Sequence, residues 1–256
     1  MVRTRVIPCL LLRNRGLVKT VKFKNLTYLG DPINIVKIFN DKEVDELIFL
    51  DITATIEQKK PPFKLLSEIA SECFMPLGYG GGIRSLEDVK EILSLGVEKV
   101  AINSYAVENP PFVRAAADLA GSQSIVVSID VKKSLFGKYE VMTHSGRKAT
   151  GLDPLKFAVE MEKMGAGELF LNSIDRDGTM QGYDLELIRR VAEAVSIPVV
   201  ACGGASTVED LGDVVKKGGA SAAAAGSMFV FHGPHRAVLI NFPTPQELRA
   251  VFTGDK

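Results

Sequence analysis

Eight short apolar runs, rich in β-branched residues, alternate along the chain with longer amphipathic segments. Buried strands of a parallel sheet have this composition, because helices cover both faces of the sheet. The segment 85–95 shows the helical pattern, with Leu86, Val89, Ile92 and Leu93 on one face. Eight β/α units predict the α/β class and a single TIM (β/α)₈ barrel, since a doubly wound sheet normally stops at five or six strands. The expected strands cover residues 5–11, 46–51, 75–79, 99–103, 124–130, 168–172, 198–202 and 222–226.

The two halves of the sequence resemble each other. GGIRSLEDVKEILSLGVEKV, from Gly81, aligns with GGASTVEDLGDVVKKGGASA, from Gly203, at an offset of 122, and FLDITAT aligns with SIDRDGT. A duplicated half-barrel explains both matches, and predicts one domain over 1–256 with halves of about 1–122 and 123–256. The loops after strands 3 and 4 should then share a role with those after strands 7 and 8. Residues 132–151 are too polar and glycine-rich for a barrel helix, so KYEVMTHSGR predicts a small hairpin after strand 5.

Composition excludes several classes of protein. Lysine plus arginine equals aspartate plus glutamate at 31 each, so no nucleic-acid or membrane partner is indicated. The apolar start reads as a first strand and not as a signal peptide, which together with three cysteines lacking C-x-x-C spacing predicts a cytoplasmic protein. The three histidines are too scattered to form a ligand set, so no metal or cofactor is implied. They are His144, His232 and His235.

Paired glycines mark the ends of two symmetry-related strands. Gly80-Gly81-Gly82 ends strand 3 and Gly203-Gly204 ends strand 7, at the face where barrel enzymes hold their active sites. Glycine lets backbone N–H groups approach an anion closely, although it also simply makes tight turns. The neighbouring strands end in Asn103-Ser104 and Gly226-Ser227, which add further donors. The repeated arrangement favours two phosphate sites and an elongated ligand with a phosphate at each end.

Carboxylates end several of the expected strands. Asp130 ends strand 5, Asp51 ends strand 2, and Asp177 follows strand 6 within DRDGT. A carboxylate at the end of a buried strand is costly unless it is solvated or paired, so Asp130 is a candidate catalytic group. Asp175 and Asp177 have turn formation as an alternative, because aspartate caps loops. The half-barrel repeat places Leu11 at the position that matches Asp130, so only one half supplies an acid there.

Several separate motifs carry a resemblance to a known family. They are IPCL, GDP at 30–32, DELIFLDITAT, GGGIRSLEDV, VAINSYAVENP, GSQSIVVSID, GAGELFLNSIDRDGT and GYDLELI. Together they resemble the cyclase subunit of imidazole glycerol phosphate synthase, from residue 5 to about 231. The resemblance implies a subunit that receives ammonia from a glutaminase subunit, through the barrel, and acts on a bisphosphorylated ribulosyl intermediate of histidine synthesis. The implied products are imidazole glycerol phosphate and an aminoimidazole carboxamide ribotide.

The resemblance also assigns roles to residues. It places Asp130 as general acid/base and Lys19 at the substrate, and with the strand-end residues it gives one expected binding set. That set is Lys19, Asp51, Gly82, Asn103, Ser104, Asn172, Asp177, Gly203, Gly204, Gly226 and Ser227. Arg5, Glu46, Lys99 and Glu168 match the charged ring at the barrel floor through which ammonia enters. These four lie at strand starts, so a structural salt-bridge network is the alternative.

The chain departs from the family pattern in three places. The catalytic aspartate of strand 1 is replaced by Leu11, the following loop reads RGLVKT where GRVVKG is usual, and FHGPHRAVLINFPTP is an unusual ending. The sequence resembles a divergent group thought to serve surface-polysaccharide synthesis, where the barrel and a glutaminase provide ammonia for amidinating a sugar. Three hypotheses follow: such an ammonia-conducting enzyme subunit, a working cyclase (a lyase) that tolerates Leu11, and a non-catalytic scaffold that activates a glutaminase.

Overall fold

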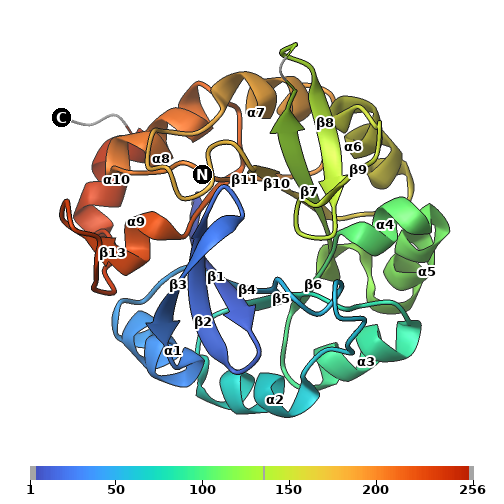
Figure 1. Ribbon diagram of the computed structural model, residues 1–256, viewed down its shortest axis with the longest axis horizontal. Coiled ribbons are helices and arrows are strands. Elements are labelled where there is room, and N and C mark those ends of the chain that lie inside the picture. Colours follow the sequence, from blue (N-terminus) through green and yellow to red (C-terminus); the bar gives the residue numbers. More distant parts are fainter. Residues whose placement is uncertain (1–3, 135, 254–256) are drawn as a thin grey trace.

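Eight parallel strands close into a barrel in the computed structural model, which describes residues 4–134 and 136–253. Neighbouring strands pair in sequence order around the barrel, and β10 pairs with β7 while β12 pairs with β1, which closes the ring (Figure 1). The barrel strands are β1 (Arg5–Arg13), β4 (Leu47–Asp51), β5 (Leu77–Gly80), β6 (Lys99–Ile102), β7 (Ile125–Lys133), β10 (Glu168–Ser173), β11 (Val199–Cys202) and β12 (Ala222–Ala225). The predicted TIM barrel is confirmed. The predicted domain limits, 1–256, include residues 1–3 and 254–256, which lie outside the described residues.

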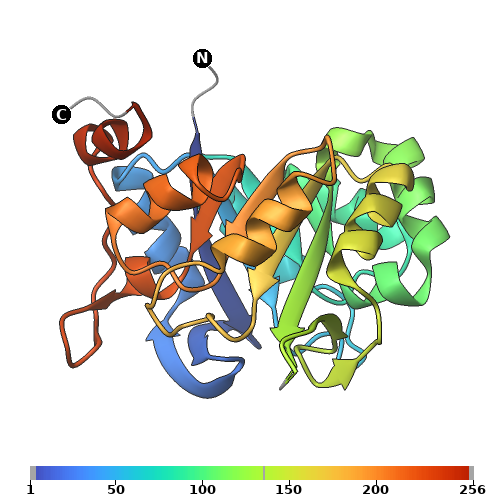
Figure 2. The ribbon, with the colours of Figure 1, turned by 90° about the horizontal axis from the view of Figure 1, so that it is seen from above.

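Helices surround the barrel and bury their apolar faces against it (Figures 1 and 2). The longer ones are α1 (Pro32–Asp41), α2 (Phe63–Glu72), α3 (Leu86–Ser94), α5 (Pro110–Ala120), α6 (Pro154–Lys163), α7 (Leu185–Ala192), α8 (Val208–Lys216) and α10 (Pro245–Thr253). Short helices α4 (Ser104–Glu108) and α9 (Ser227–Val230) follow β6 and β12, and a 3₁₀ turn, η1 (Ser122–Ser124), precedes β7. The main core lies between helices and strands, and a second apolar cluster fills the barrel interior. No helix in the described part of the chain is long and apolar enough to cross a membrane.

The sequence repeat has a structural counterpart at the starts of α3 and α8. Ser85 caps α3 in a reciprocal capping box with Asp88, and Thr207 caps α8 in the same way with Asp210. Each side chain satisfies a backbone N–H that the first helical turn leaves without a partner. The two caps are separated by the same 122 residues as the glycine pairs, so both halves turn from strand to helix in one geometry.

The strand registers show which residues are equivalent in the two halves. Leu11 pairs with Leu50 between β1 and β4, and Asp130 pairs with Asn172 between β7 and β10. Leu50 and Asn172 in turn lie opposite Gly80 and Cys202, which are 122 residues apart. Leu11 therefore occupies the layer of the barrel that Asp130 occupies in the other half, as the repeat predicts.

The same registers correct one part of the predicted repeat. Asp51 is the last residue of β4 and is equivalent to Ser173, the last residue of β10. The alignment of FLDITAT with SIDRDGT, which sets Asp51 against Asp175, is therefore wrong by two residues at this point. Asp175 lies in the loop beyond the strand end. Loops are free to differ in length between repeats, whereas ladder hydrogen bonds fix strand register.

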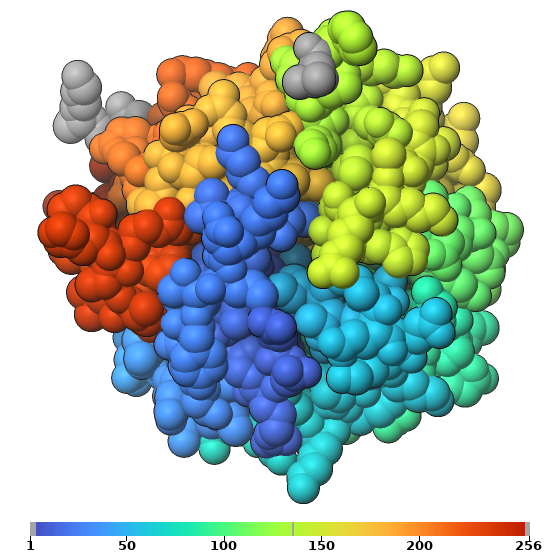
Figure 3. Space-filling view, in the orientation of Figure 1, coloured from blue at the N-terminus to red at the C-terminus, as the bar shows by residue number. Residues whose placement is uncertain are grey.

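Three hairpins extend the barrel at its mouth, the face formed by the carboxyl ends of the strands. β1 continues into antiparallel β2 (Gly16–Val21) and β3 (Lys24–Gly30), which the sequence did not predict. β7 continues into β8 (Tyr139–Thr143) and β9 (Lys148–Ala149), which confirms the hairpin predicted after strand 5. The third consists of β13 (Phe231–His232) and β14 (Ala237–Val238). The first two lie on either side of the mouth in the space-filling view (Figure 3).

Candidate active site

A cavity at the mouth brings the expected binding residues together. Its volume is about 120 Å³, roughly ten times what one water molecule needs, so it has room for a small ligand. Its lining includes Lys19, Asp51, Asn103, Ser104, Asp130, Asn172, Asp177, Gly203, Gly204, Gly226 and Ser227. Gly82 lines a smaller adjoining cavity of about 30 Å³ together with Asn103 and Ser104. Residues from both halves of the barrel therefore face one site.

Asp130 is buried in this cavity between two side-chain amides. Asn103 Nδ2 donates to Asp130 Oδ2 at 3.1 Å, and Asn172 Nδ2 donates to Oδ1 at 3.4 Å. The pKa of Asp130 is raised from 3.8 to about 7, mainly because the carboxyl group is buried. The hydrogen bond from Asn172 lowers this pKa, the negative charge of Asp177 raises it, and the hydrogen bond from Asn103 lowers it by a smaller amount. A carboxyl group with this pKa can both accept and donate a proton near neutral pH, which suits a general acid/base.

Asn172 has an acceptor that the protein does not use. Its Oδ1 is buried and has no hydrogen-bond partner in the described part of the chain. The atom faces Gly203, where an added Cβ would lie only 2.9 Å from it. A buried acceptor without a partner is costly, so this atom indicates a donor from outside the protein, such as a hydroxyl or N–H group of a ligand.

Leu11 lines the same cavity and is 8% exposed. Its apolar side chain packs in the interior cluster of the barrel, with Val18 and Cys9 among its members. The cavity therefore has one acid, Asp130, at the level where the repeat provides two equivalent positions. In the described lining, no second carboxylate lies at the level of Leu11. Asp51 and Asp177 also line the cavity, but each lies at least one residue closer to the mouth along its own segment.

Lys19 and Asp177 form a buried ion pair across the mouth. Lys19 Nζ lies 2.6 Å from Asp177 Oδ1, and Thr20 Oγ1 donates to Asp177 Oδ2 at 2.9 Å. The β2–β3 hairpin carries Lys19 over the barrel, and Lys22 N donates to the Asp177 carbonyl at 2.8 Å. Turn formation alone therefore does not account for Asp177, because its carboxylate neutralises a buried lysine.

The other two carboxylates hold loops. Asp51 Oδ1 accepts hydrogen bonds from Thr53 N, Thr53 Oγ1 and Ala54 N, at 2.9 to 3.0 Å, which is an Asx turn after β4. Asp175 Oδ2 accepts from Lys133 N at 2.7 Å and ties the β10–α7 loop to β7. The turn-forming alternative thus describes Asp175, while Asp51 both shapes its loop and lines the cavity.

The glycines of the two expected phosphate sites are required by the loops themselves. A Cβ on Gly82 would lie 2.5 Å from the Lys59 carbonyl, and one on Gly204 would lie 2.1 Å from the Gly182 carbonyl. Both residues also have positive φ, at 70° and 112°. Their being glycine is therefore explained without a ligand. The argument for phosphate rests instead on Ser104 and Ser227, whose hydroxyls line the cavities beside them.

The four charged residues at the barrel floor form a closed ring of alternating sign. Arg5 contacts both Glu46 and Glu168, and Lys99 Nζ lies 2.9 Å from Oε2 of each glutamate. Burial alone would lower the pKa of Arg5, but the hydrogen bonds and negative charges of the two glutamates outweigh it and raise that pKa. The sequence-based expectation that the four charges pair is thereby met. The same geometry fits both alternatives, a structural salt-bridge network and a gate for ammonia.

Some of the polar residues at the site were not anticipated from the sequence. Thr20 holds Asp177, and Ser145 Oγ donates to the Ile52 carbonyl at 2.7 Å from the β8–β9 hairpin. Arg236, in the β13–β14 turn, donates to the Gly178 carbonyl at 3.0 Å. All three reach the mouth from hairpins, whose path across the barrel leaves no periodic signal in the sequence. Within the described residues no cluster of His, Cys, Asp or Glu side chains could hold a metal ion.

The raised pKa of Asp130 predicts a dependence of stability on pH. Between about pH 4 and 7 the folded protein keeps a proton that the unfolded chain releases, so the free energy of unfolding should fall as the pH rises through this window. The effect is at most about 4 kcal/mol. Urea unfolding at pH 5 and pH 8 measures it. Asp130→Asn should flatten the dependence, whereas Asp118→Asn, an exposed carboxylate on α5, should not; equal slopes in both variants would contradict the assignment.

Comparison with known proteins identifies the family. The histidine biosynthesis protein family matches residues 5–235. A Pseudomonas aeruginosa protein provisionally named imidazole glycerol phosphate synthase subunit hisF2 is 54% identical over 248 residues, covering 97% of this chain and 99% of that protein. Provisionally named HisF of Leptospira interrogans is 49% identical over 98% of this chain and 100% of its own, and provisionally named hisF3 of Vibrio vulnificus is 50% identical over 96% and 95%. The chain therefore belongs to the histidine biosynthesis protein family, as a HisF-like member.

Proposed function

We propose that this chain is the cyclase-type synthase subunit of a glutamine amidotransferase complex, and that it has diverged toward supplying ammonia for sugar amidination in surface-polysaccharide synthesis. One observation carries the divergence: Leu11 stands in the active-site layer opposite Asp130, within a cavity that otherwise keeps its polar residues. An apolar side chain cannot transfer a proton, and it disfavours a polar intermediate beside it.

The barrel interior supports a route for ammonia from floor to mouth. Above the ring of Arg5, Glu46, Lys99 and Glu168, the interior is lined by an apolar cluster that includes Ala222, Ala224 and Val126. Neutral ammonia crosses apolar surroundings more readily than the ammonium ion does, because it has no charge that must be removed from water. We infer that the ring admits ammonia released by a glutaminase docked on the floor.

The residues at the mouth have separable roles in the proposed reaction. Asp130, with its pKa near 7, takes a proton from the attacking nitrogen and donates it to the oxygen of the carbonyl group that is attacked. Asn172 Oδ1 receives a donor of the ligand and orients it against Asp130. The Lys19–Asp177 pair holds the β2–β3 hairpin over the cavity, which excludes bulk water.

A working cyclase of histidine synthesis is the second candidate. It is supported by the provisional names of the relatives and by the acid/base group that remains. A scaffold that only activates a glutaminase is disfavoured, because it gives no use for the orphaned acceptor of Asn172 or for the raised pKa of Asp130.

Isotope transfer separates these candidates. The chain, a glutaminase and a sugar-amidinating enzyme with its sugar substrate are incubated with amide-¹⁵N glutamine, and label is followed by mass spectrometry. We expect label in a sugar amidine. Label in imidazole glycerol phosphate, when the bisphosphorylated ribulosyl intermediate is supplied, would favour the cyclase instead. Label that remains entirely as free ammonium with both acceptors would favour the scaffold.

A further inference from the structure

The β13–β14 hairpin belongs to the C-terminal segment that departs from the family pattern. It places the side chain of Arg236 beside the mouth of the barrel. Arg236 lies in its turn, where Arg236 N donates to the Gly233 carbonyl at 3.1 Å. The guanidinium lies 4.5 Å from the centre of the Phe231 ring and donates from Nη1 to the Gly178 carbonyl and from Nη2 to Ser227 Oγ, at 3.0 and 3.3 Å. Gly178 and Ser227 both line the main cavity.

The positive charge of Arg236 is not paired with any carboxylate among the described residues. Within residues 4–134 and 136–253 it forms no ion pair, although its side chain is partly buried. The neighbouring cation, Lys19, packs against Gly226, where an added Cβ would lie 2.8 Å from Lys19 Cε, but Asp177 neutralises it. Arg176 in the adjacent loop turns to the Gln181 carbonyl at 2.9 Å. Partly buried arginines of this kind are commonly completed by an anion.

The contact with Arg236 also frees the hydroxyl hydrogen of Ser227. Ser227 Oγ accepts from Arg236 and, in the described part of the chain, donates to no protein acceptor. The hydroxyl can therefore donate to a ligand oxygen in the cavity. At the equivalent position in the other half, Ser104 Oγ accepts from His144 N at 3.0 Å and donates to Asn103 Oδ1 at 3.2 Å, so its hydrogen is occupied.

The two ends of the mouth therefore differ in charge. At the β5–β6 end the nearby arginine, Arg84, has Glu108 3.7 Å away as a partner and lies over the Tyr105 ring. At the β11–β12 end, none of the described carboxylates forms such a pair with Arg236. The orphaned acceptor of Asn172, 6% exposed and facing Gly203, is an independent sign that a ligand occupies this side of the cavity.

We propose that Arg236 is the positioning cation of the phosphate site already expected at the carboxyl ends of β11 and β12, where it directs the Ser227 hydroxyl toward a dianionic phosphomonoester. The phosphate bound there faces a cation, whereas the arginine near the β5–β6 end, Arg84, is already paired with Glu108. The assignment rests on the proposed function for the identity of the ligand, but the site itself is tested without glutamine, ammonia or turnover.

The test is a titration of the ¹⁵N-labelled protein with inorganic phosphate, followed separately at the amides of Gly204 and Ser227 and at those of Gly82 and Ser104. Arg236→Gln keeps a donor for Ser227 and removes the charge. It should raise the Kd at the β11–β12 end at least about tenfold and leave the β5–β6 end unchanged. Arg236→Lys should restore most of the affinity, and the difference between Gln and Lys should shrink as sodium chloride is added.

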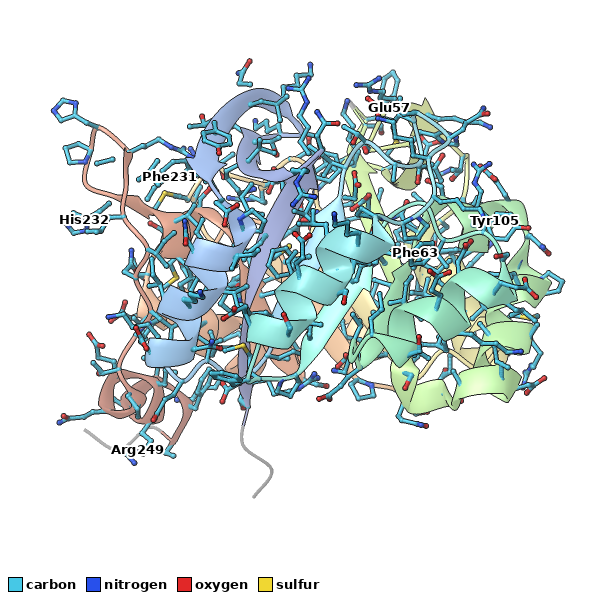
Figure 4. The ribbon with its side chains drawn as sticks, turned by 90° about the horizontal axis from the view of Figure 1, so that it is seen from below. Glu57, Phe63, Tyr105, Phe231, His232 and Arg249 are labelled. Carbon is cyan, nitrogen blue, oxygen red and sulfur yellow. The ribbon has the colours of Figure 1, made fainter. Side chains whose placement is uncertain are left out.

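Arg249→Gln is the matched control. It removes the same charge from an exposed arginine of α10, at the end of the molecule away from the hairpin that carries Phe231 and His232 (Figure 4). It should leave both Kd values unchanged. The proposal is overturned if wild-type protein binds no phosphate at the β11–β12 end, or if Arg236→Gln binds it as tightly as Arg236→Lys. A purely structural role would give an equal effect at both ends that does not respond to salt.

Discussion

Turnover of the bisphosphorylated ribulosyl intermediate, with excess ammonium salt in place of glutamine, should be at least about 100-fold slower than in a cyclase with aspartates on both strands. Loss of one proton-transfer group typically costs roughly 10²- to 10⁴-fold in rate. Here the loss is compounded, because Leu11 is buried and packs apolar surface against the position of the missing carboxylate. Product formation measured by absorbance or chromatography decides the matter. A rate within a fewfold of normal would contradict the divergent role.

Leu11→Asp is the corresponding gain-of-function test. It should restore part of the cyclase activity, because strand register places the new carboxylate in the same layer as Asp130. Recovery should be incomplete, since the loop that follows, RGLVKT at 15–20, also departs from the family pattern. Leu11→Met, which keeps an apolar side chain of similar volume, is the control and should recover nothing. Thermal unfolding of both variants shows whether the buried acid destabilises the barrel.

The barrel was predictable because its strands are buried on both sides. The centres of runs such as 124–130 and 168–172 are apolar, and the observed strands begin within two residues of the expected starts. The expected starts of β4, β5, β7 and β11 are too early, and for β5 and β11 the reason is a proline. Pro76 and Pro198 lack an N–H, so they precede β5 and β11 and offer only their carbonyls, to Leu47 and Leu169.

The contacts across the mouth were not predictable from local pattern. The β2–β3 hairpin has mixed polarity and lies over the barrel, so it shows neither a helical nor a buried-strand period. It carries Lys19 to Asp177, which is 158 positions away in the sequence. Arg236 reaches Ser227 through a two-residue ladder that no propensity would detect. By contrast, residues at strand ends, such as Asp130, were found because the topology of a parallel barrel alone brings strand ends together.

A glutaminase subunit should bind the floor of the barrel and be activated by it. The ring of Arg5, Glu46, Lys99 and Glu168 lies at the strand starts, a face that barrel enzymes normally leave to stability. Co-expressed proteins should elute as one complex in size-exclusion chromatography, with an interface of roughly 1,200–2,000 Å². Mixing should raise glutaminase activity at least severalfold. Elution as separate monomers would remove the main support for an ammonia route.

Lys99→Ala should uncouple the two activities. Among the described residues, Arg5 and Lys99 are the two cations that contact both Glu46 and Glu168. Loss of Lys99 therefore leaves two buried carboxylates with one cation between them. We expect the ring to loosen and to let water in, so that ammonia escapes and the yield of aminated product per glutamine hydrolysed falls severalfold. Lys217→Ala is the control: it removes an exposed lysine paired with Asp213 on α8 and should leave the yield unchanged. If Lys99→Ala gave the wild-type yield while the complex stayed intact, the ring would be a structural network and not a gate.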